Sequence, residues 1–272
     1  MRRITLLTNP DVCNLHCPLC FLNQRAFAFG MGEMPFEIAK AAIEKYAAER
    51  DASGKRLLRE VIPSTMGEPL LYSHFDELLE LCRAFGIPLN LTTNGTFPGK
   101  WGSDAAMELL LRSCCDIKVS YLASEQFDGW KANVEKLVRV RDGLRENTRC
   151  ATVSLQVTLH KKNLQDVPEI VSWASAIGVD RIKWNKVVLL KGVPPEFRKE
   201  YELSENDVAL LRSRLKSTKV HCEGSLFFTD SHNGDCAMGG VCGVSCPFMN
   251  EIWILPDGSE NHCPDPERRF GM

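Results

Sequence analysis

The feature that most constrains the fold of this chain is a regular alternation of strand-like and helix-like segments. Six segments rich in apolar and β-branched residues have the length of strands, at residues 3–9, 58–65, 87–93, 116–121, 152–159 and 180–187. Other segments carry apolar residues at the three- and four-residue spacing of amphipathic helices, for example 36–49, 75–85, 164–178 and 205–217. Crossover helices return the chain to the same end of a sheet, so the strands are predicted to be parallel. Six such units predict an α/β fold, a partial (βα)6 TIM-like barrel, with its chemistry at the carboxyl ends of the strands.

Three local signals mark the ends of predicted helices. Ser73 with Asp76, and Ser204 with Asp207, have the spacing of a capping box, in which each side chain accepts a backbone N–H of the first turn. Gly178 follows an amphipathic segment, at the position where a left-handed residue commonly ends a helix. The signals predict helices that begin after the two serines and end at Gly178.

The pattern changes near residue 218. Residues 220–228 have the composition of one more strand, residues 233–250 form a loop rich in glycine and cysteine, and residues 251–263 indicate a hairpin that turns at Asp257-Gly258. We therefore expect a barrel over residues 1–218 and a small C-terminal iron–sulfur appendage over residues 219–272. The appendage is predicted to dock on the barrel rather than to form an independent domain.

Charge and cysteine content limit the classes of function. The 272 residues carry a formal net charge of −2 and no run of lysine and arginine, so no basic groove for nucleic acid is expected. The chain has no apolar run long enough to span a membrane and no signal-peptide pattern, so we expect a cytoplasmic protein without a membrane partner. In that compartment twelve cysteines indicate metal binding or redox chemistry rather than disulfides. Four scattered ones are predicted to lie in the core: Cys82, Cys114, Cys115 and Cys150.

The first motif is an array of three cysteines directly after the first predicted strand. Cys13, Cys17 and Cys20 have the spacing C-x3-C-x2-C. Three thiolates on one loop can bind three corners of a 4Fe–4S cluster and leave one iron open to an outside ligand. A structural zinc site prefers four protein ligands, which this array does not supply alone.

This array resembles the signature of the radical S-adenosylmethionine (SAM) superfamily. The resemblance implies that Leu19 contacts the adenine of SAM and that Phe21 closes the cluster loop. The segment Met66-Gly67-Glu68-Pro69, at the end of the second predicted strand, is similar to the family's Gly-Gly-Glu-Pro motif. In the family this motif binds the methionine ammonium, a role that suits a carboxylate and backbone carbonyls.

The resemblance also assigns cofactor contacts to later strand ends, from their position alone. It implies that residues ending the third to sixth strands bind the ribose, adenine or carboxylate of SAM, namely Thr93, Asn94, Ser120, Gln156, Thr158, Asn185 and Val187. The expected cofactors are SAM and two 4Fe–4S clusters, one binding SAM and one auxiliary. A flavodoxin- or ferredoxin-type protein is the expected electron donor.

The second motif supplies ligands for the auxiliary cluster. Cys246, Gly258 and Cys263 read C-x11-G-x4-C, which resembles the hairpin that begins the twitch and SPASM appendages of the same superfamily. The candidate ligands of one auxiliary cluster are Cys222, Cys236, Cys242, Cys246 and Cys263. A structural zinc site is the alternative.

Five candidates for four ligand positions leave one thiol over. A radical enzyme that inverts a C–H centre must return hydrogen to the opposite face of the carbon, and a cysteine S–H is a suitable donor. The glycine-rich setting favours Cys246 as this donor, with Cys222, Cys236, Cys242 and Cys263 as metal ligands. The hairpin pattern instead makes Cys246 a ligand, and Cys222 is then the spare thiol or part of the core.

The charge of the tail bears on the substrate. Residues 222–272 contain eight acidic residues and only two basic ones, which would attract a cationic small molecule. With one auxiliary cluster and a spare thiol, the chain resembles neomycin-type aminoglycoside epimerases. The resemblance implies an isomerase of antibiotic biosynthesis in which a 5′-deoxyadenosyl radical abstracts hydrogen and Cys246 returns it. The alternatives are dehydrogenation of an aminocyclitol alcohol, peptide modification and, in a different class, a non-enzymatic iron–sulfur electron carrier.

Overall fold

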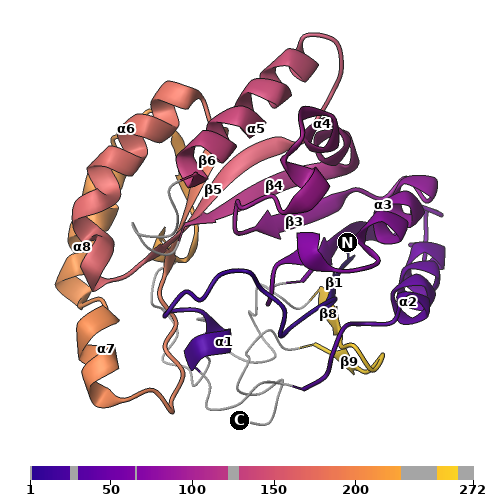
Figure 1. Ribbon diagram of the computed structural model, residues 1–272, viewed down its shortest axis with the longest axis horizontal. Helices are drawn as coiled ribbons and strands as arrows, with labels where there is room; N and C mark the ends of the chain where they lie inside the picture. The colour runs from indigo at the N-terminus through magenta and orange to yellow at the C-terminus, as the bar shows by residue number, and fades with distance from the viewer. Residues whose placement is uncertain (1, 25–29, 65, 122–128, 228–249, 263–272) are drawn as a thin grey trace.

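The structure, a computed structural model, describes residues 2–24, 30–64, 66–121, 129–227 and 250–262. Within these residues, nine strands form one sheet in the order β7-β6-β5-β4-β3-β2-β1-β8-β9 (Figure 1). All neighbouring strands are parallel except β8 and β9. The strands are β1 (Arg2–Leu6), β2 (Leu58–Pro63), β3 (Leu89–Thr93), β4 (Cys114–Tyr121), β5 (Thr152–Leu159), β6 (Arg181–Lys186), β7 (His221–Glu223), β8 (Glu251–Ile254) and β9 (Glu260–Asn261). The predicted α/β class and the parallel order of β1 to β6 are confirmed.

Helices cover one side of this curved sheet. Helices α2 to α6 and α8 lie along its outer side, whereas the short helix α1 lies across the inner side in the view of Figure 1. The helices are α1 (Phe21–Gln24), α2 (Phe36–Ala48), α3 (Phe75–Ala84), α4 (Asp104–Ser113), α5 (Trp130–Arg145), α6 (Val167–Ile177), α7 (Pro195–Tyr201) and α8 (Glu205–Leu215). This arrangement is that of a partial TIM-like barrel.

Two of the three predicted helix-end signals are confirmed and one is wrong. The Ser204 hydroxyl accepts the backbone N–H of Asp207 at 3.2 Å, and Gly178 ends α6 in the left-handed region with φ of 80°. Helix α3 instead begins after His74 without a side-chain cap. The Ser73 backbone N–H donates to Glu33 at 3.1 Å, and its hydroxyl bonds the same carboxylate. A tertiary contact from the loop before α2 therefore replaces the local cap.

Alternation along the strands separates an apolar outer face from a polar inner face. In β5 the side chains of Val153, Leu155, Val157 and Leu159 are fully buried in the core beneath the helices. Burying each such side chain stabilises the fold by roughly 1.5–3 kcal/mol. The intervening residues, Thr152, Ser154, Gln156 and Thr158, are polar and lie on the inner face. The sheet therefore presents polar side chains to the concave side of the barrel.

The described parts of the C-terminal tail join the sheet at both edges. Strand β7 pairs with β6, and β8 pairs with β1. The predicted hairpin is confirmed, because β8 and β9 are antiparallel and the Leu255 N–H donates to the Ser259 carbonyl at 2.9 Å. The division at residue 218 stays a prediction, because residues 228–249 and 263–272 lie outside the described part of the chain.

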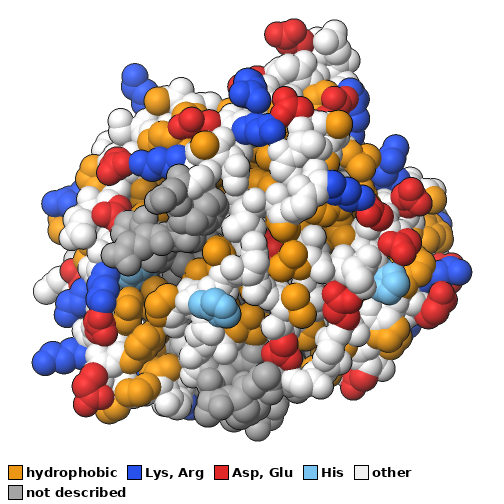
Figure 2. Space-filling model, viewed as in Figure 1, with side chains coloured by type: hydrophobic (Ala, Val, Ile, Leu, Met, Phe, Trp, Pro, Cys, Tyr) orange, Lys and Arg blue, Asp and Glu red, His pale blue; other side chains and the backbone are white. Residues whose placement is uncertain are grey.

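The described surface carries charges of both signs. On the face shown in Figure 2, basic and acidic side chains are distributed around the rim and do not gather in one large patch of one sign. None of the described helices combines the length and the apolar character needed to cross a membrane.

Candidate active site at the carboxyl ends of the strands

The three cysteines of the first motif lie on the loop between β1 and α1. Cys13, Cys17 and Cys20 are all half-buried. The loop is ordered by its own hydrogen bonds: the Cys20 N–H donates to the Cys17 carbonyl at 3.0 Å, and the Asn23 amide donates to the same carbonyl at 2.8 Å. Helix α1 begins directly after Cys20. The relative positions of Cys17 and Cys20 are therefore set by one compact turn.

The electrostatics of this loop disfavour three free thiolates. Burial, followed by the charges of Cys20 and Cys13, raises the pKa of Cys17 to about 11. Positive charge from bound iron would offset this repulsion. Among the described residues, no three His, Cys, Asp or Glu side chains converge closely enough to bind a single metal ion. Three cysteines on one loop can instead bind separate irons of a four-iron cluster.

Glu68 is a buried carboxylate beside the cysteine loop. Its Oε1 accepts hydrogen bonds from the Thr93 hydroxyl at 2.8 Å and the Leu70 N–H at 3.2 Å, and its Oε2 accepts one from the Asn94 N–H at 2.7 Å. Only 1% of the residue is exposed, and burial raises the pKa of its carboxyl to about 7. No lysine or arginine in the described part of the chain pairs with it. Such a carboxylate is suited to bind a cation from outside the protein.

Gly67 holds the segment of residues 66–69 against the chain that leads into the cysteine loop. Its φ is 76°, and a Cβ atom at this position would lie 2.1 Å from the Asn9 carbonyl oxygen and 2.6 Å from that of Val12. Next to it, the Glu68 N–H donates to the Val12 carbonyl at 2.8 Å, and the Asn9 amide donates to the Glu68 carbonyl at 2.7 Å. Only glycine allows this close approach, which holds Glu68 near the segment that precedes Cys13.

Asn94, at the end of β3, contacts both the cysteine loop and Glu68. Its side-chain Nδ2 lies 3.6 Å from the Cys13 sulfur and 2.8 Å from the Asn14 Oδ1. Its backbone N–H bonds Glu68, as described above. The predicted site residues Thr93 and Asn94 are thus brought into contact with Glu68 and the first cysteine.

Apolar side chains close the underside of the cysteine loop. Met66 is buried with Leu7 and Trp253, and Phe21 packs against this group. Leu19 is 7% exposed, and Pro69 is buried at the start of a short 3-10 helix, Pro69–Leu71. The methionine in place of the family's first glycine therefore has a packing role.

The family assignment rests on a match that contains the three cysteines and the segment of residues 66–69. A family model described as the Radical SAM superfamily matches residues 10–174. This chain belongs to the radical SAM superfamily. Binding of SAM and of one radical SAM 4Fe–4S cluster is accordingly expected of it.

Individual relatives are distant. The chain is 22% identical over 180 residues to the "tungsten-containing aldehyde ferredoxin oxidoreductase cofactor-modifying protein" of Pyrococcus furiosus, a match that covers 62% of this chain and 47% of that protein. Among solved structures it is similar to Streptococcus suis SuiB bound to S-adenosylmethionine, with 16% identity, a TM-score of 0.64, and coverage of 96% of this chain and 60% of SuiB. It is also similar to anSMEcpe with bound AdoMet, with 15% identity, a TM-score of 0.64, and coverage of 97% and 72%. The chain thus spans about half of the curated relative, and the structural likeness shows the fold.

One residue that sequence reasoning missed links two loops of the radical SAM core. The Gln24 side-chain amide donates to the Leu19 carbonyl at 2.7 Å and the Val188 carbonyl at 3.1 Å, and its oxygen accepts the Leu190 N–H at 2.9 Å. Gln24 therefore ties the cysteine loop to the segment after β6. A glutamine four residues after the third cysteine gives no signal of this role in the sequence.

The remaining predicted cofactor contacts share one wall of the radical SAM barrel. Ser120 pairs in register with Gln156, and Thr158 pairs with Asn185, across β4, β5 and β6. All four side chains are half-buried. The backbone N–H of Val187 donates to the Leu159 carbonyl at 2.9 Å, which continues this pairing beyond β6. The structure brings these residues together on the inner face, and their contact with SAM stays a prediction.

Cys222 lies on the outer face of the sheet, unlike its neighbours in β7. It pairs in register with Ile182, whose side chain is fully buried in the core. The Trp184 indole N–H donates to the Cys222 sulfur at 3.2 Å, and the Thr218 hydroxyl lies 3.2 Å from the same atom. The other predicted auxiliary ligands and the predicted hydrogen donor lie outside the described residues: Cys236, Cys242, Cys246 and Cys263. Of the scattered cysteines, Cys82 and Cys114 are buried as expected, whereas Cys115 and Cys150 are half-buried.

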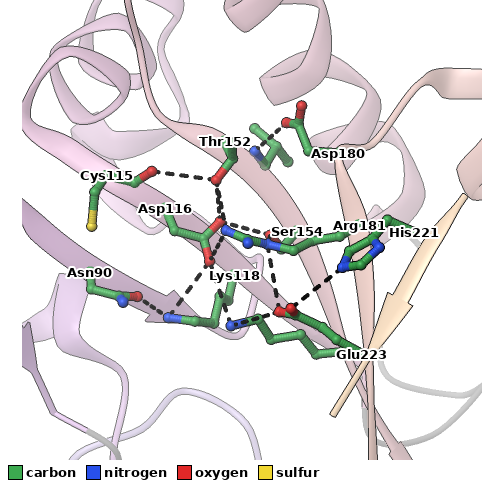
Figure 3. A network of polar contacts seen from close by, with 12 residues as sticks. Asn90, Cys115, Asp116, Lys118, Thr152, Ser154, Asp180, Arg181, His221 and Glu223 are labelled. Atoms are coloured by element: carbon green, nitrogen blue, oxygen red, sulfur yellow. Dashed lines mark hydrogen bonds and ion pairs between the residues drawn. The ribbon is translucent and has the colours of Figure 1, made fainter.

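A second group that sequence reasoning missed is a charged network on the inner face of β4 to β7, which we call the Asp116 network (Figure 3). Its members are Asp116, Lys118, Arg181, Lys183 and Glu223. Their alternation along the strands is visible in the sequence, but only the register between strands brings the five charges together.

Proposed function

We propose that Cys13, Cys17 and Cys20 bind the 4Fe–4S cluster and that Glu68 binds the methionine ammonium of SAM. The contact of Asn94 with both Cys13 and Glu68 carries this proposal. It brings a cysteine donor set next to a buried carboxylate that pairs with no lysine or arginine among the described residues. An electron carrier has no need for such a carboxylate. The non-enzymatic alternative therefore receives no support from this site.

When bound, the cluster and SAM supply a 5′-deoxyadenosyl radical that abstracts hydrogen from an unactivated carbon. The protein holds the reactants and excludes water. In this proposal Leu19 and Phe21 cover the adenine side of the cysteine loop. The ribose and adenine are positioned by polar groups of the inner wall, namely Ser120, Gln156, Thr158, Asn185 and the backbone of Val187. A cytoplasmic flavodoxin- or ferredoxin-type protein would supply the electron.

We further propose that the enzyme is an epimerase in which Cys246 donates the hydrogen atom. After abstraction from one face, the Cys246 S–H transfers hydrogen to the other face, and the resulting thiyl radical regains an electron and a proton. A twitch-like auxiliary cluster next to this thiol is the proposed source of the electron.

The contacts of Cys222 bear on the ligands of that cluster. Its hydrogen bond from Trp184 and its position on the outer face support a structural thiol. The auxiliary ligands would then come from Cys236, Cys242 and Cys263, with Cys246 either as donor or as fourth ligand. If Cys246 is the fourth ligand, no spare thiol remains, and oxidation of an aminocyclitol alcohol becomes the better proposal.

An aminoglycoside is the first candidate substrate, and the acidic tail is its support. Within the described residues, however, three tail carboxylates already pair with cations: Glu223 with Lys183 at 3.2 Å, Glu251 with Arg3 at 2.6 Å and Glu260 with Lys45 at 2.7 Å. Attraction of a polycation therefore depends on Asp257, whose carboxylate accepts hydrogen bonds from Ser259, and on Asp230, Asp235, Asp265 and Glu267, which lie outside the described residues. A peptide is the second candidate, favoured by the similarity of this fold to SuiB bound to its precursor peptide and to anSMEcpe bound to a peptide.

Heavy water distinguishes these proposals. The reconstituted enzyme, with SAM and a reductant in D2O, is incubated with a neomycin-class aminoglycoside or with a peptide. An epimerase places one deuterium from the exchangeable S–H at the inverted carbon of its true substrate. Product oxidised by two electrons and without deuterium contradicts the epimerase and supports the dehydrogenase.

A further inference from the structure

The Asp116 network is built around one buried carboxylate. Asp116 Oδ1 accepts hydrogen bonds from the Thr152 and Ser154 hydroxyls, each at 2.7 Å. Its Oδ2 lies 3.2 Å from Arg181 Nη2 and 3.9 Å from both Lys118 Nζ and Lys183 Nζ. The Asp116 side chain is 5% exposed, so it is available to few other partners. Three cations thus share a single fixed anion.

Glu223 is the second carboxylate of the network, and its setting is different. It lies 3.2 Å from Lys183 Nζ, 3.7 Å from Arg181 Nε and 3.7 Å from His221 Nε2. Its side chain is 34% exposed and belongs to a three-residue strand at the edge of the sheet. Glu223 is therefore the member of the network that another anion can replace at least cost.

With these two carboxylates and three cations, the network carries one surplus positive charge. Lys118 is the most buried of the three cations, with 10% of its side chain exposed. Its ammonium donates to Asn90, and burial together with the Lys183 charge lowers its pKa to about 8. The next carboxylate along the wall is Glu60, which accepts a hydrogen bond from the Asn90 amide at 3.1 Å and shares Arg3 with Glu251. Together with Arg3, Glu60 and Glu251, four cations face four carboxylates, so an incoming anion has to replace a carboxylate that is already present.

The network borders the proposed cofactor wall. Lys183 pairs in register with Gln156, Gln156 with Ser120, and Glu223 with Lys183, so one row crosses four strands. After Glu223, Gly224 has φ of 114°, and a Cβ atom there would lie 2.4 Å from the Trp184 carbonyl oxygen. The close approach of β7 to β6, which only glycine permits here, sets the position of Glu223 against Lys183.

We propose that Lys118, Arg181 and Lys183 form a binding site for a carboxylate group of the substrate, and that Glu223 occupies this site when substrate is absent. The inference rests on the proposed function in one respect, that the concave side of the barrel is the substrate cavity. It names the substrate class as one with a free carboxylate, such as a peptide or amino acid. A monoanion replaces the single charge of Glu223, whereas a phosphate dianion exceeds it.

The test uses two variants of one ion pair that should act in opposite directions. Binding of N-acetylglycine, and of its neutral amide as a reference, is measured by calorimetry on the reconstituted full-length enzyme with SAM. Lys183→Gln removes a ligand of the carboxylate and should weaken binding about tenfold. Glu223→Gln removes the internal competitor and should strengthen binding about tenfold. The amide should not bind to any variant.

A pair of the same chemistry outside the network serves as the control. Lys45→Gln and Glu260→Gln disrupt the ion pair between α2 and β9 and should leave N-acetylglycine affinity unchanged. Opposite changes in N-acetylglycine affinity that occur only in the two network variants support the proposed site. Shifts of the same sign in Lys183→Gln and Glu223→Gln, no shift in either, or stronger binding of inorganic phosphate than of N-acetylglycine would overturn it. Release of deoxyadenosine is followed in every variant: if it persists while the carboxylate site fails, only the inference falls, and if the parent enzyme releases none, the proposed function falls.

Discussion

The Asn94 side-chain Nδ2 lies 3.6 Å from the Cys13 sulfur, a contact between the end of β3 and the first cysteine of the loop after β1. The backbone N–H of the same residue donates to Glu68 at 2.7 Å. One residue therefore fixes the distance between the proposed cluster ligand and the proposed ammonium ligand. Its two contacts can be tested separately, because a side-chain substitution leaves the backbone bond in place.

Asn94→Ala should lower the reduction potential of the SAM-binding cluster. An N–H donor stabilises the extra negative charge of the reduced state, and potentials of such clusters respond to hydrogen bonds at sulfur. Loss of a bond worth about 1 kcal/mol corresponds to roughly 40 mV for one electron. A redox titration followed by EPR measures the shift, with Asn133→Ala, which is bonded to the Gly95 carbonyl instead, as a control. An unchanged potential would mean that Asn94 does not contact the bound cluster.

The affinity for SAM should depend on pH through Glu68. Burial raises the pKa of this carboxyl to about 7 in the cofactor-free protein, and the ammonium requires the ionised form. Affinity should therefore rise about tenfold per pH unit below 7 and level off above it. Glu68→Gln should bind SAM about ten- to a hundredfold more weakly near pH 8 and lose this pH dependence. Equilibrium binding between pH 5.5 and 8 provides the measurement, and a parent protein with a flat profile would show that the ammonium is held elsewhere.

Gly67→Ala should disrupt the contact between the segment of residues 66–69 and the chain that leads into the cysteine loop. The substitution places a methyl group 2.1 Å from a backbone oxygen and forces alanine to a φ of 76°. The left-handed backbone conformation alone costs alanine about 1–2 kcal/mol of stability, and the steric clash adds to this cost. Gly54→Ala is the matched control, because its φ is 80° and no atom lies within 4 Å of the new Cβ. Chemical denaturation should show a larger loss of stability in Gly67→Ala, together with loss of SAM binding. Equal losses in the two variants would contradict the proposed close approach.

The sequence predicts well those features that depend on nearby residues. Strand β5 begins and ends where its alternation indicates, at Thr152 and Leu159, because one face is fully buried. The Ser204 cap is local and is confirmed, whereas the Ser73 cap fails because Glu33, forty residues away, bonds its side chain. Cys13, Cys17 and Cys20 are recognisable because their spacing lies within one loop.

Features that depend on register between strands are not visible in the sequence. Cys222 faces the core because it pairs with Ile182, and a three-residue strand is too short to show this parity. The Asp116 network arises from charges on three strands, β4, β6 and β7, whose side chains meet only in the folded sheet. Gln24 likewise owes its role to the Val188 carbonyl and the Leu190 N–H, both more than 160 residues away.

The two cysteines that compete for the roles of ligand and hydrogen donor should behave differently. Cys222→Ser keeps the hydrogen bonds of a partly buried thiol, so it should retain about eight irons per chain and full turnover. Cys246→Ala should keep the iron and the first hydrogen abstraction but form deoxyadenosine at most once per active site, without inverted product. Iron analysis and product analysis separate the outcomes. Loss of iron in Cys246→Ala makes that residue a ligand, and normal epimerisation by both variants leaves no role for a spare thiol.

The most direct test of the central claim is release of deoxyadenosine from SAM by the anaerobically reconstituted, reduced protein. The parent chain should cleave SAM and contain about eight irons, four in each of two clusters. Replacing Cys13, Cys17 and Cys20 together by alanine should remove about half of the iron and all of the cleavage. A matched triple variant at Cys82, Cys114 and Cys150, which are predicted core thiols, should retain the iron and the cleavage when folded. Cleavage of SAM by the Cys13, Cys17 and Cys20 variant would contradict the assignment of the radical-generating site.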